Sequence, residues 1–106
     1  MKTYMGKLRA GGVGGQVILV IDNDGSSKLL PHIVRHSPDG FNWGFGGSGP
    51  ADTALSILTD CVGNDVANAF YQRFKSEFVA GWKESFEITA KEIKDWLLSI
   101  TKDEKY

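Results

Sequence analysis

The pattern of apolar and polar positions divides the chain into a strand-like first half and a helical second half. Short apolar segments bounded by glycine, proline and turn residues predict strands over residues 3–8, 17–21 and 27–30, with further candidate strands at 33–35 and 41–43. The nearly continuous β-branched run at 17–21 is typical of a central strand that is covered on at least one face. Gly25 suits the left-handed position of the turn that follows this run. We therefore expect a small antiparallel meander of three or four strands.

The second half carries stretches in which apolar residues recur at helical spacing. The first helix is predicted to begin at Pro50, with Gly49 as its N-cap, and to end at Gly63. Asn64 is expected to cap the second helix. The apolar stripe of that second helix consists of Val66, Ala67, Phe70, Phe74 and Phe78. Each of these helices therefore has one face suited to a core.

The third helix has the clearest local signals in the chain. Thr89 and Glu92 form a capping-box pattern, and Ile88 with Ile93 can close a hydrophobic staple across it. The segment 86–88 just before the box is predicted to be extended and able to pair with the edge of the sheet. The buried stripe of this helix is predicted to be Ile93, Trp96, Leu97 and Ile100.

These elements predict an α+β fold, a small antiparallel β-meander of three or four strands followed by three helices packed on one face of the sheet. Residues 1–106 are expected to form a single domain. Within it, residues 1–49 are expected to be β-rich and to include a glycine–aromatic loop as well as a flexible glycine connection at 11–15. Residues 50–101 are expected to be helical and residues 102–106 to form a frayed tail.

Composition narrows the classes of protein that this chain can belong to. Its hydrophobic content of 42% and charged content of 24% are ordinary for a soluble domain. A net charge of −1 argues against nucleic acid as a partner and gives no general attraction to anionic membranes. The longest apolar run, 17–21, is too short to span a bilayer, and the first residues lack the apolar core of a secretory signal. Cys61 is the single cysteine, which indicates a reducing cytoplasmic location and a buried structural thiol.

The most unusual segment of the chain runs from residue 36 to residue 50, with the sequence His-Ser-Pro-Asp-Gly-Phe-Asn-Trp-Gly-Phe-Gly-Gly-Ser-Gly-Pro. Its three aromatic residues alternate, so an extended backbone would point all three rings to one face. That face either covers the helices or forms an exposed platform for a partner. The candidate binding residues are His36, Phe41, Trp43, Phe45, Gly46, Gly47, Ser48 and Gly49.

Residues 44–49 also satisfy the G-x-G-x-x-G pattern of dinucleotide-binding loops. No parallel strand follows the helix and the chain is short for a doubly wound sheet, so the context of that motif is missing. A simpler anion site at the helix start remains open, although Asp52 at the third helical position already places negative charge there.

Catalytic and metal-binding patterns are incomplete. A nucleophile elbow at Ser48 would need glycine two residues later, where Pro50 stands. His32 and His36 have the spacing of metal ligands on a helix, but flanking prolines predict extended or turned backbone there. Residues 22–25 resemble the start of a calcium loop, yet the glycine comes too early and the bidentate glutamate is missing. We expect no catalytic residues, metal or cofactor.

Residues 36–51, continuing into 54–58, resemble a widespread family of small proteins of unknown function from bacteria, archaea and their phages. The resemblance includes a Tyr-x-Gly opening at residues 4–6 and segments like 70–75 and 88–97. It spans nearly the whole chain and carries no assigned reaction. It implies a small accessory protein, often encoded on a mobile element.

The leading hypothesis is therefore a non-enzymatic interaction domain of a phage or mobile element, which binds a host or partner protein. Inhibition of a host defence nuclease is one concrete form of this hypothesis. The alternative is a small-molecule, nucleotide or anion-binding module that uses the backbone of residues 46–49 with His36 nearby. A third hypothesis is a self-associating structural protein.

Overall fold

The structure is a computed structural model that describes residues 1–9 and 15–104, with side chains as far as Thr101. It confirms the α+β class. Four strands form one antiparallel sheet in the order β3-β2-β1-β4. The strands are β1 (Thr3–Lys7), β2 (Ile18–Ile21), β3 (Ser27–Leu29) and β4 (Ser85–Thr89). Apart from Gly15, the predicted glycine connection lies outside the described residues.

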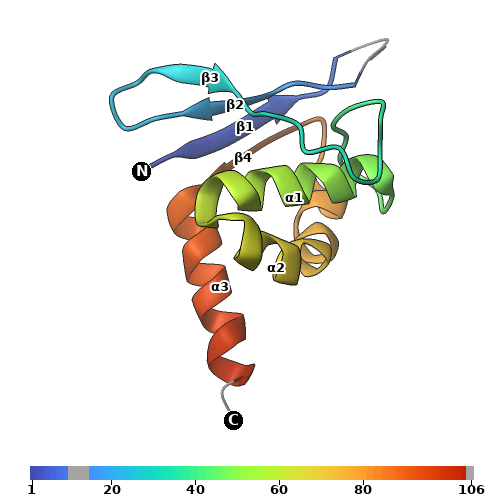
Figure 1. Cartoon of the computed structure of the whole chain (residues 1–106). Coiled ribbons are helices and arrows are strands. Elements are labelled where there is room, and N and C mark those ends of the chain that lie inside the picture. The colour runs from blue at the N-terminus through green and yellow to red at the C-terminus, as the bar shows by residue number, and fades with distance from the viewer. Residues whose placement is uncertain (10–14, 105–106) are drawn as a thin grey trace.

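The helices all lie on one side of the sheet, as Figure 1 shows. They are α1 (Ser48–Val62), α2 (Asn64–Glu77), the 3₁₀ turn η1 (Val79–Gly81) and α3 (Ala90–Glu104). In Figure 1, α1 runs directly beneath the sheet, α2 lies beneath α1, and α3 extends away from both. Within the described part of the chain, no helix is long and apolar enough to cross a membrane.

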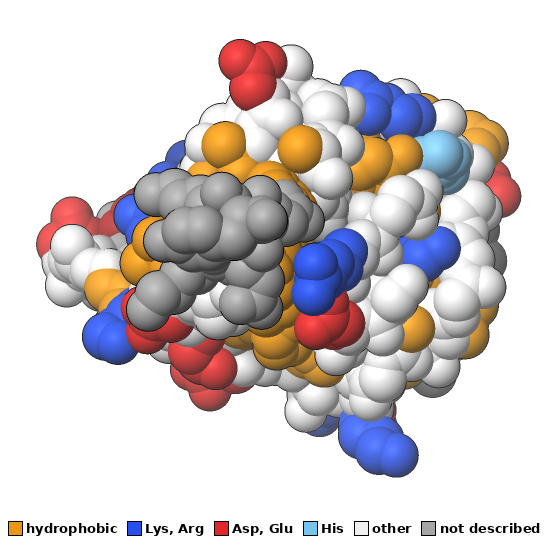
Figure 2. All heavy atoms as spheres, turned by 90° about the horizontal axis from the view of Figure 1, so that it is seen from below, with side chains coloured by type: hydrophobic (Ala, Val, Ile, Leu, Met, Phe, Trp, Pro, Cys, Tyr) orange, Lys and Arg blue, Asp and Glu red, His pale blue; other side chains and the backbone are white. Residues whose placement is uncertain are grey.

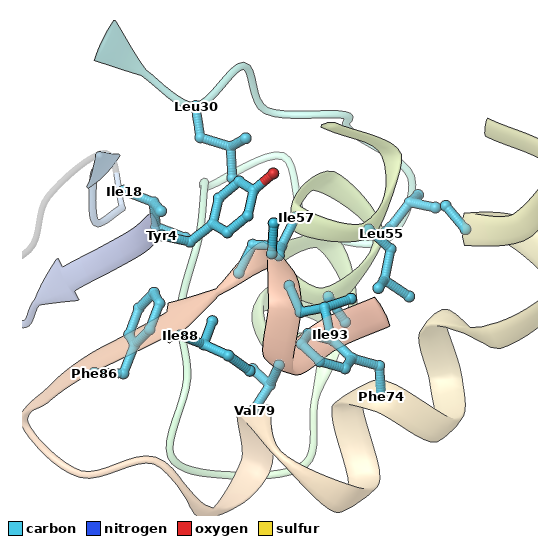
Figure 3. Close-up of a cluster of buried hydrophobic side chains, with 14 of the residues drawn as sticks. Tyr4, Ile18, Leu30, Leu55, Ile57, Phe74, Val79, Phe86, Ile88 and Ile93 are labelled. Carbon is cyan, nitrogen blue, oxygen red and sulfur yellow. The ribbon is translucent and has the colours of Figure 1, made fainter. Parts of the chain in front are cut away.

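Helix α1 forms the middle layer of the molecule. All ten residues from 49 to 58 are buried, including three polar ones. This burial follows from the layering, because the sheet covers one side of α1 while α2 and the preceding loop cover the others. Figure 3 shows the resulting core, to which strands and helices both contribute. Its labelled members are Tyr4, Ile18, Leu30, Leu55, Ile57, Phe74, Val79, Phe86, Ile88 and Ile93.

The extended segment predicted at 86–88 is confirmed as part of β4, which pairs with β1 in the register Tyr4 to Ile88 and Gly6 to Phe86. The sheet therefore takes its fourth strand from between two helices. The strands predicted at 33–35 and 41–43 were wrong. Only an isolated bridge between Gln16 and Phe41 forms there, and the rest of the segment is loop.

The helix ends differ from the predictions by a few residues. Helix α1 begins at Ser48 with Gly47 as its N-cap, two residues before the expected start, because the Ala51 N–H already donates to the Gly47 carbonyl at 3.0 Å. Asn64 is the first residue of α2 and does not cap it through its side chain. Helix α3 continues to Glu104, so residues 102–104, expected in the frayed tail, are helical.

The capping box at the start of α3 is confirmed. The Glu92 N–H donates to Thr89 Oγ1 at 3.1 Å, and the Thr89 N–H donates to Glu92 Oε1 at 3.2 Å. Ile88 and Ile93, the predicted staple, are both buried. These contacts join β4 to α3 with no intervening loop.

Candidate functional site

The loop of residues 31–47 wraps around α1, and a buried aspartate of that helix holds it. The Asp52 side chain is fully buried, and its carboxylate accepts hydrogen bonds from the backbone N–H groups of Arg35 (3.3 Å), His36 (2.9 Å) and Ser37 (3.0 Å). His32 Nε2 lies 2.9 Å from the same carboxylate. Asp52 is the fifth residue of α1 and serves the loop, so the expectation that it sits at the third helical position for the helix dipole was wrong.

The ionisation of Asp52 reflects two opposing effects. Burial acts to raise the pKa of its carboxyl, while the hydrogen bonds from His32 and from the three backbone N–H groups act to lower it. The hydrogen bonds prevail, and the pKa of Asp52 lies below its ordinary value. The loop is therefore organised around a carboxylate that keeps its negative charge at neutral pH.

Two further polar side chains of α1 hold the same loop. The Thr53 hydroxyl donates to the Asn42 carbonyl at 2.7 Å and accepts from the Asn42 N–H at 3.1 Å. The Ser56 hydroxyl accepts from the Ile33 N–H at 2.9 Å. Loop backbone that would have bonded to a neighbouring strand bonds to the helix instead. This explains why the predicted strands at 33–35 and 41–43 do not form.

The three aromatic residues of the loop have different environments. Phe41 is 4% exposed and Trp43 is 2% exposed, so both rings lie in the core and neither forms part of an exposed platform. The Trp43 ring packs edge-on against Phe86 of β4. Trp43 Nε1 also donates to the Lys83 carbonyl at 3.0 Å. Phe45 is 49% exposed. The alternation breaks at Gly44, whose φ of +88° turns the chain before the third ring.

The glycines that follow Phe45 in the sequence also have different surroundings. A Cβ at Gly49 would lie 2.7 Å from Asn42 Cβ, so this glycine permits close contact between the loop and α1. A Cβ at Gly46 would have no heavy atom within 4 Å. Gly46 and Ser48 are exposed. We call Phe45, Gly46, Gly47 and Ser48 the loop tip.

His36 lies on a separate exposed part of the loop, beside α2. Its Nε2 is 2.7 Å from the hydroxyl of Tyr71. The Arg35 guanidinium lies 5.9 Å from the centre of the Tyr71 ring and donates to the side chain of Asn68. Sequence reasoning missed Tyr71 and Asn68 because they belong to another element and lie outside its apolar stripe.

A hollow of about 580 Å³ lies at the other end of the molecule, near the start of β1 and α3. In it, Asp60 accepts hydrogen bonds from the Tyr4 hydroxyl at 2.7 Å and from Lys2 Nζ at 3.2 Å. Burial and the bond to Asp60 raise the pKa of Tyr4, and burial raises the pKa of the neighbouring Cys61 thiol. The charged lining residues are Lys2, Lys91, Lys94, Asp22, Asp60 and Asp95. Because the lining contains equal numbers of lysines and aspartates, the hollow shows no preference for a cationic or an anionic ligand.

Charges are mixed elsewhere on the surface as well. Figure 2 shows the molecule from below, where basic and acidic side chains are interspersed on the visible face. Among the described residues, no group of three or more histidine, cysteine, aspartate or glutamate side chains is placed to hold a metal ion. Of the two histidines, His32 contacts Asp52 and His36 contacts Tyr71.

The sheet, its helical layer and the anchored loop define a small α+β domain in which one buried helix organises a long glycine-rich loop. A family of unknown function, DUF6166, matches residues 4–99, and the chain belongs to this family. No curated protein and no solved structure matches the chain.

Proposed function

We propose that this protein is a non-enzymatic interaction module that binds a partner protein through the loop tip. The observation that carries the proposal is the half-exposed ring of Phe45, which is 49% exposed between segments that are firmly anchored. Large aromatic side chains are common anchors in protein interfaces, because they bury much apolar area at a small entropic cost.

The backbone on both sides of the tip is held in place. On one side, Trp43 is buried and the Gly44 N–H donates to the Val79 carbonyl at 3.0 Å. On the other side, Gly47 caps α1 and its carbonyl accepts the Ala51 N–H at 3.0 Å. A partner would therefore meet a preorganised surface, and little binding free energy would be lost in ordering the loop.

Gly46 provides a second argument for the same proposal. Its surroundings leave room for a side chain and its φ lies outside the left-handed region. The fold therefore does not require glycine at this position. Because glycine has no side chain, a partner can approach the backbone closely beside the exposed ring. Binding would therefore explain the glycine at this position.

The partner's identity is also part of the proposal. The resemblance to small accessory proteins of phages and mobile elements supports a host protein as the partner. One concrete form of the proposal is that the protein inhibits a host defence nuclease in the cytoplasm.

The alternative function is binding of an anion by backbone N–H groups at the start of α1. It is less favoured because Pro50, the third residue of the helix, has no N–H to donate.

The test compares tagged protein with tip variants in affinity capture from a host lysate, followed by mass spectrometry. Phe45→Ala removes the anchor and Gly46→Trp adds an obstacle, and both are expected to lose the captured protein with unchanged circular dichroism. Leu98→Ala is the control, because Leu98 is a comparable apolar side chain, 67% exposed on α3. Capture by both tip variants at the wild-type level would contradict the proposal. A thermal shift with inorganic phosphate that Gly46→Trp abolishes would favour the anion alternative.

A further inference from the structure

We propose a second binding surface, the outer face of the sheet, which takes an amphipathic helix of a partner with acidic side chains beside its apolar stripe. This surface is on the side of the sheet opposite the helices of this chain (Figure 1). It is independent of the loop tip. Its apolar members are Met5, Val17, Leu19 and Leu29.

The strand register makes these side chains contiguous. Met5 lies opposite Leu19, and Leu19 lies opposite Leu29, so an apolar row crosses three strands. Side chains at such positions are in direct contact range. Leu19 is 37% exposed and Leu29 is 61% exposed, and Val17 beside them is 40% exposed.

The sequence at 17–21, which includes β2, is typical of a strand that is covered on both faces of the sheet. An antiparallel strand with one solvated face alternates apolar and polar residues, whereas 17–21 is apolar throughout. Ile18 and Val20 face the core, and Leu19 faces outward. A hollow of about 500 Å³ opens over Met5 and Leu19. The helices of the described part of the chain lie on the opposite side of the sheet (Figure 1).

The outer face of the sheet is too small to hold a dimer by itself and has the dimensions of a single short helix. Four strands of at most five residues give a face of roughly 19 by 17 Å. Pairing two such faces buries about 300 Å² per copy, well under the roughly 800 Å² per partner of a stable interface. A helix is about 10 Å wide and rises about 1.5 Å per residue, so about eleven residues span the face.

Charge complementarity favours an acidic partner. Lys7 and Arg9 line the hollow, with Glu87 as the one acidic residue among its lining groups. Lys7 is exposed and takes part in none of the ion pairs within the described residues. Among the residues that the structure describes, the Arg9 guanidinium donates to the Gly15 carbonyl at 3.4 Å and forms no ion pair. Both cations are therefore available to carboxylates that flank an apolar stripe.

The experiment titrates the isotope-labelled full-length protein with two synthetic helical peptides. Both carry the same leucine stripe, and glutamates flank it in one peptide where lysines flank it in the other. We expect the acidic peptide to bind about tenfold more tightly, with a difference that shrinks at about 0.5 M salt. Its NMR shifts should map to Met5, Val17 and Leu19.

Variants separate the two contributions. Leu19→Lys should abolish binding of both peptides, and Lys7→Glu should remove the preference for the acidic one. Leu98→Lys and Lys94→Glu, both exposed on α3, are the matched controls and should change neither. The proposal is overturned if neither peptide binds, if the basic peptide binds as well, or if the shifts map to other surfaces. A concentration-dependent dimer that Leu19→Lys disrupts would overturn it in favour of a second copy.

Discussion

At the scale of single residues, three polar side chains of α1 explain the shape of the loop. Asp52, Thr53 and Ser56 lie on a helix that is otherwise apolar from 49 to 58, and each bonds to loop backbone. Buried polar groups must find hydrogen-bond partners, and here the partners are N–H groups that would otherwise have paired with a strand. The loop is therefore determined by the helix that it wraps.

Asp52→Asn is expected to lower the free energy of unfolding at pH 7 by about 3 kcal/mol, because the amide replaces a charged acceptor of several backbone N–H groups. Asp65→Asn, an exposed change on α2, should cost no more than about 0.5 kcal/mol. Urea unfolding monitored by circular dichroism measures both. An Asp52 variant as stable as the wild type would show that the carboxylate does not hold the loop.

The same carboxylate predicts a dependence on pH. Because folding lowers the pKa of Asp52, its stabilising contribution is complete above the unfolded pKa, about 4, and is lost as pH falls through the lower folded value. The wild type should lose stability below about pH 4, and its advantage over Asp52→Asn should narrow there. Urea unfolding of both proteins across this range measures the difference, and a constant advantage would contradict the assignment.

At the scale of elements, the junction between the loop and α1 decides which candidate residues are exposed. Gly44 turns the chain with a positive φ, so Phe45 leaves the core that Phe41 and Trp43 occupy. Gly49 then brings the helix against Asn42. Gly44 and Gly49 therefore have structural roles, as does the N-cap Gly47, whereas the fold does not require glycine at position 46.

Gly49→Ala is expected to destabilise the protein by about 1–3 kcal/mol, because its Cβ would meet Asn42 Cβ at 2.7 Å in a packed site. Gly46→Ala is the matched control in the same loop and should change the free energy of unfolding by less than about 0.5 kcal/mol. Thermal unfolding compares the two variants. Equal losses would show that the close contact with Asn42 is not what requires glycine at position 49.

At the scale of the whole molecule, the sheet has one face covered by helices and one face that the helices leave uncovered. All helices of the described part of the chain pack on one face of the sheet (Figure 1). The other face keeps apolar side chains at its surface. Leu29 and Leu30 are neighbours in sequence, yet Leu29 is 61% exposed and Leu30 is 5% exposed. Their position relative to the layers, rather than their chemistry, sets their contribution to stability.

Leu30→Ala should lower the free energy of unfolding by about 2–5 kcal/mol, since it leaves a cavity in the core. Leu29→Ala should change it by less than about 0.5 kcal/mol, because the side chain is mostly solvated in the folded state. Denaturant unfolding of the two variants tests this. A comparable loss at Leu29 would show that a further part of the chain covers the outer face.

The sequence by itself determined the helices, the capping box of α3 and the turn at Gly25, because each depends on residues within a few positions of one another. It also indicated β4 at 86–88, although not which strand it would pair with. The tertiary structure alone decided that Phe45 is exposed while Phe41 and Trp43 are buried, and that Tyr71 joins His36. Those outcomes depend on contacts between residues far apart in the chain. Buried polar side chains of α1 form hydrogen bonds with loop backbone that the local sequence pattern predicted to pair in strands.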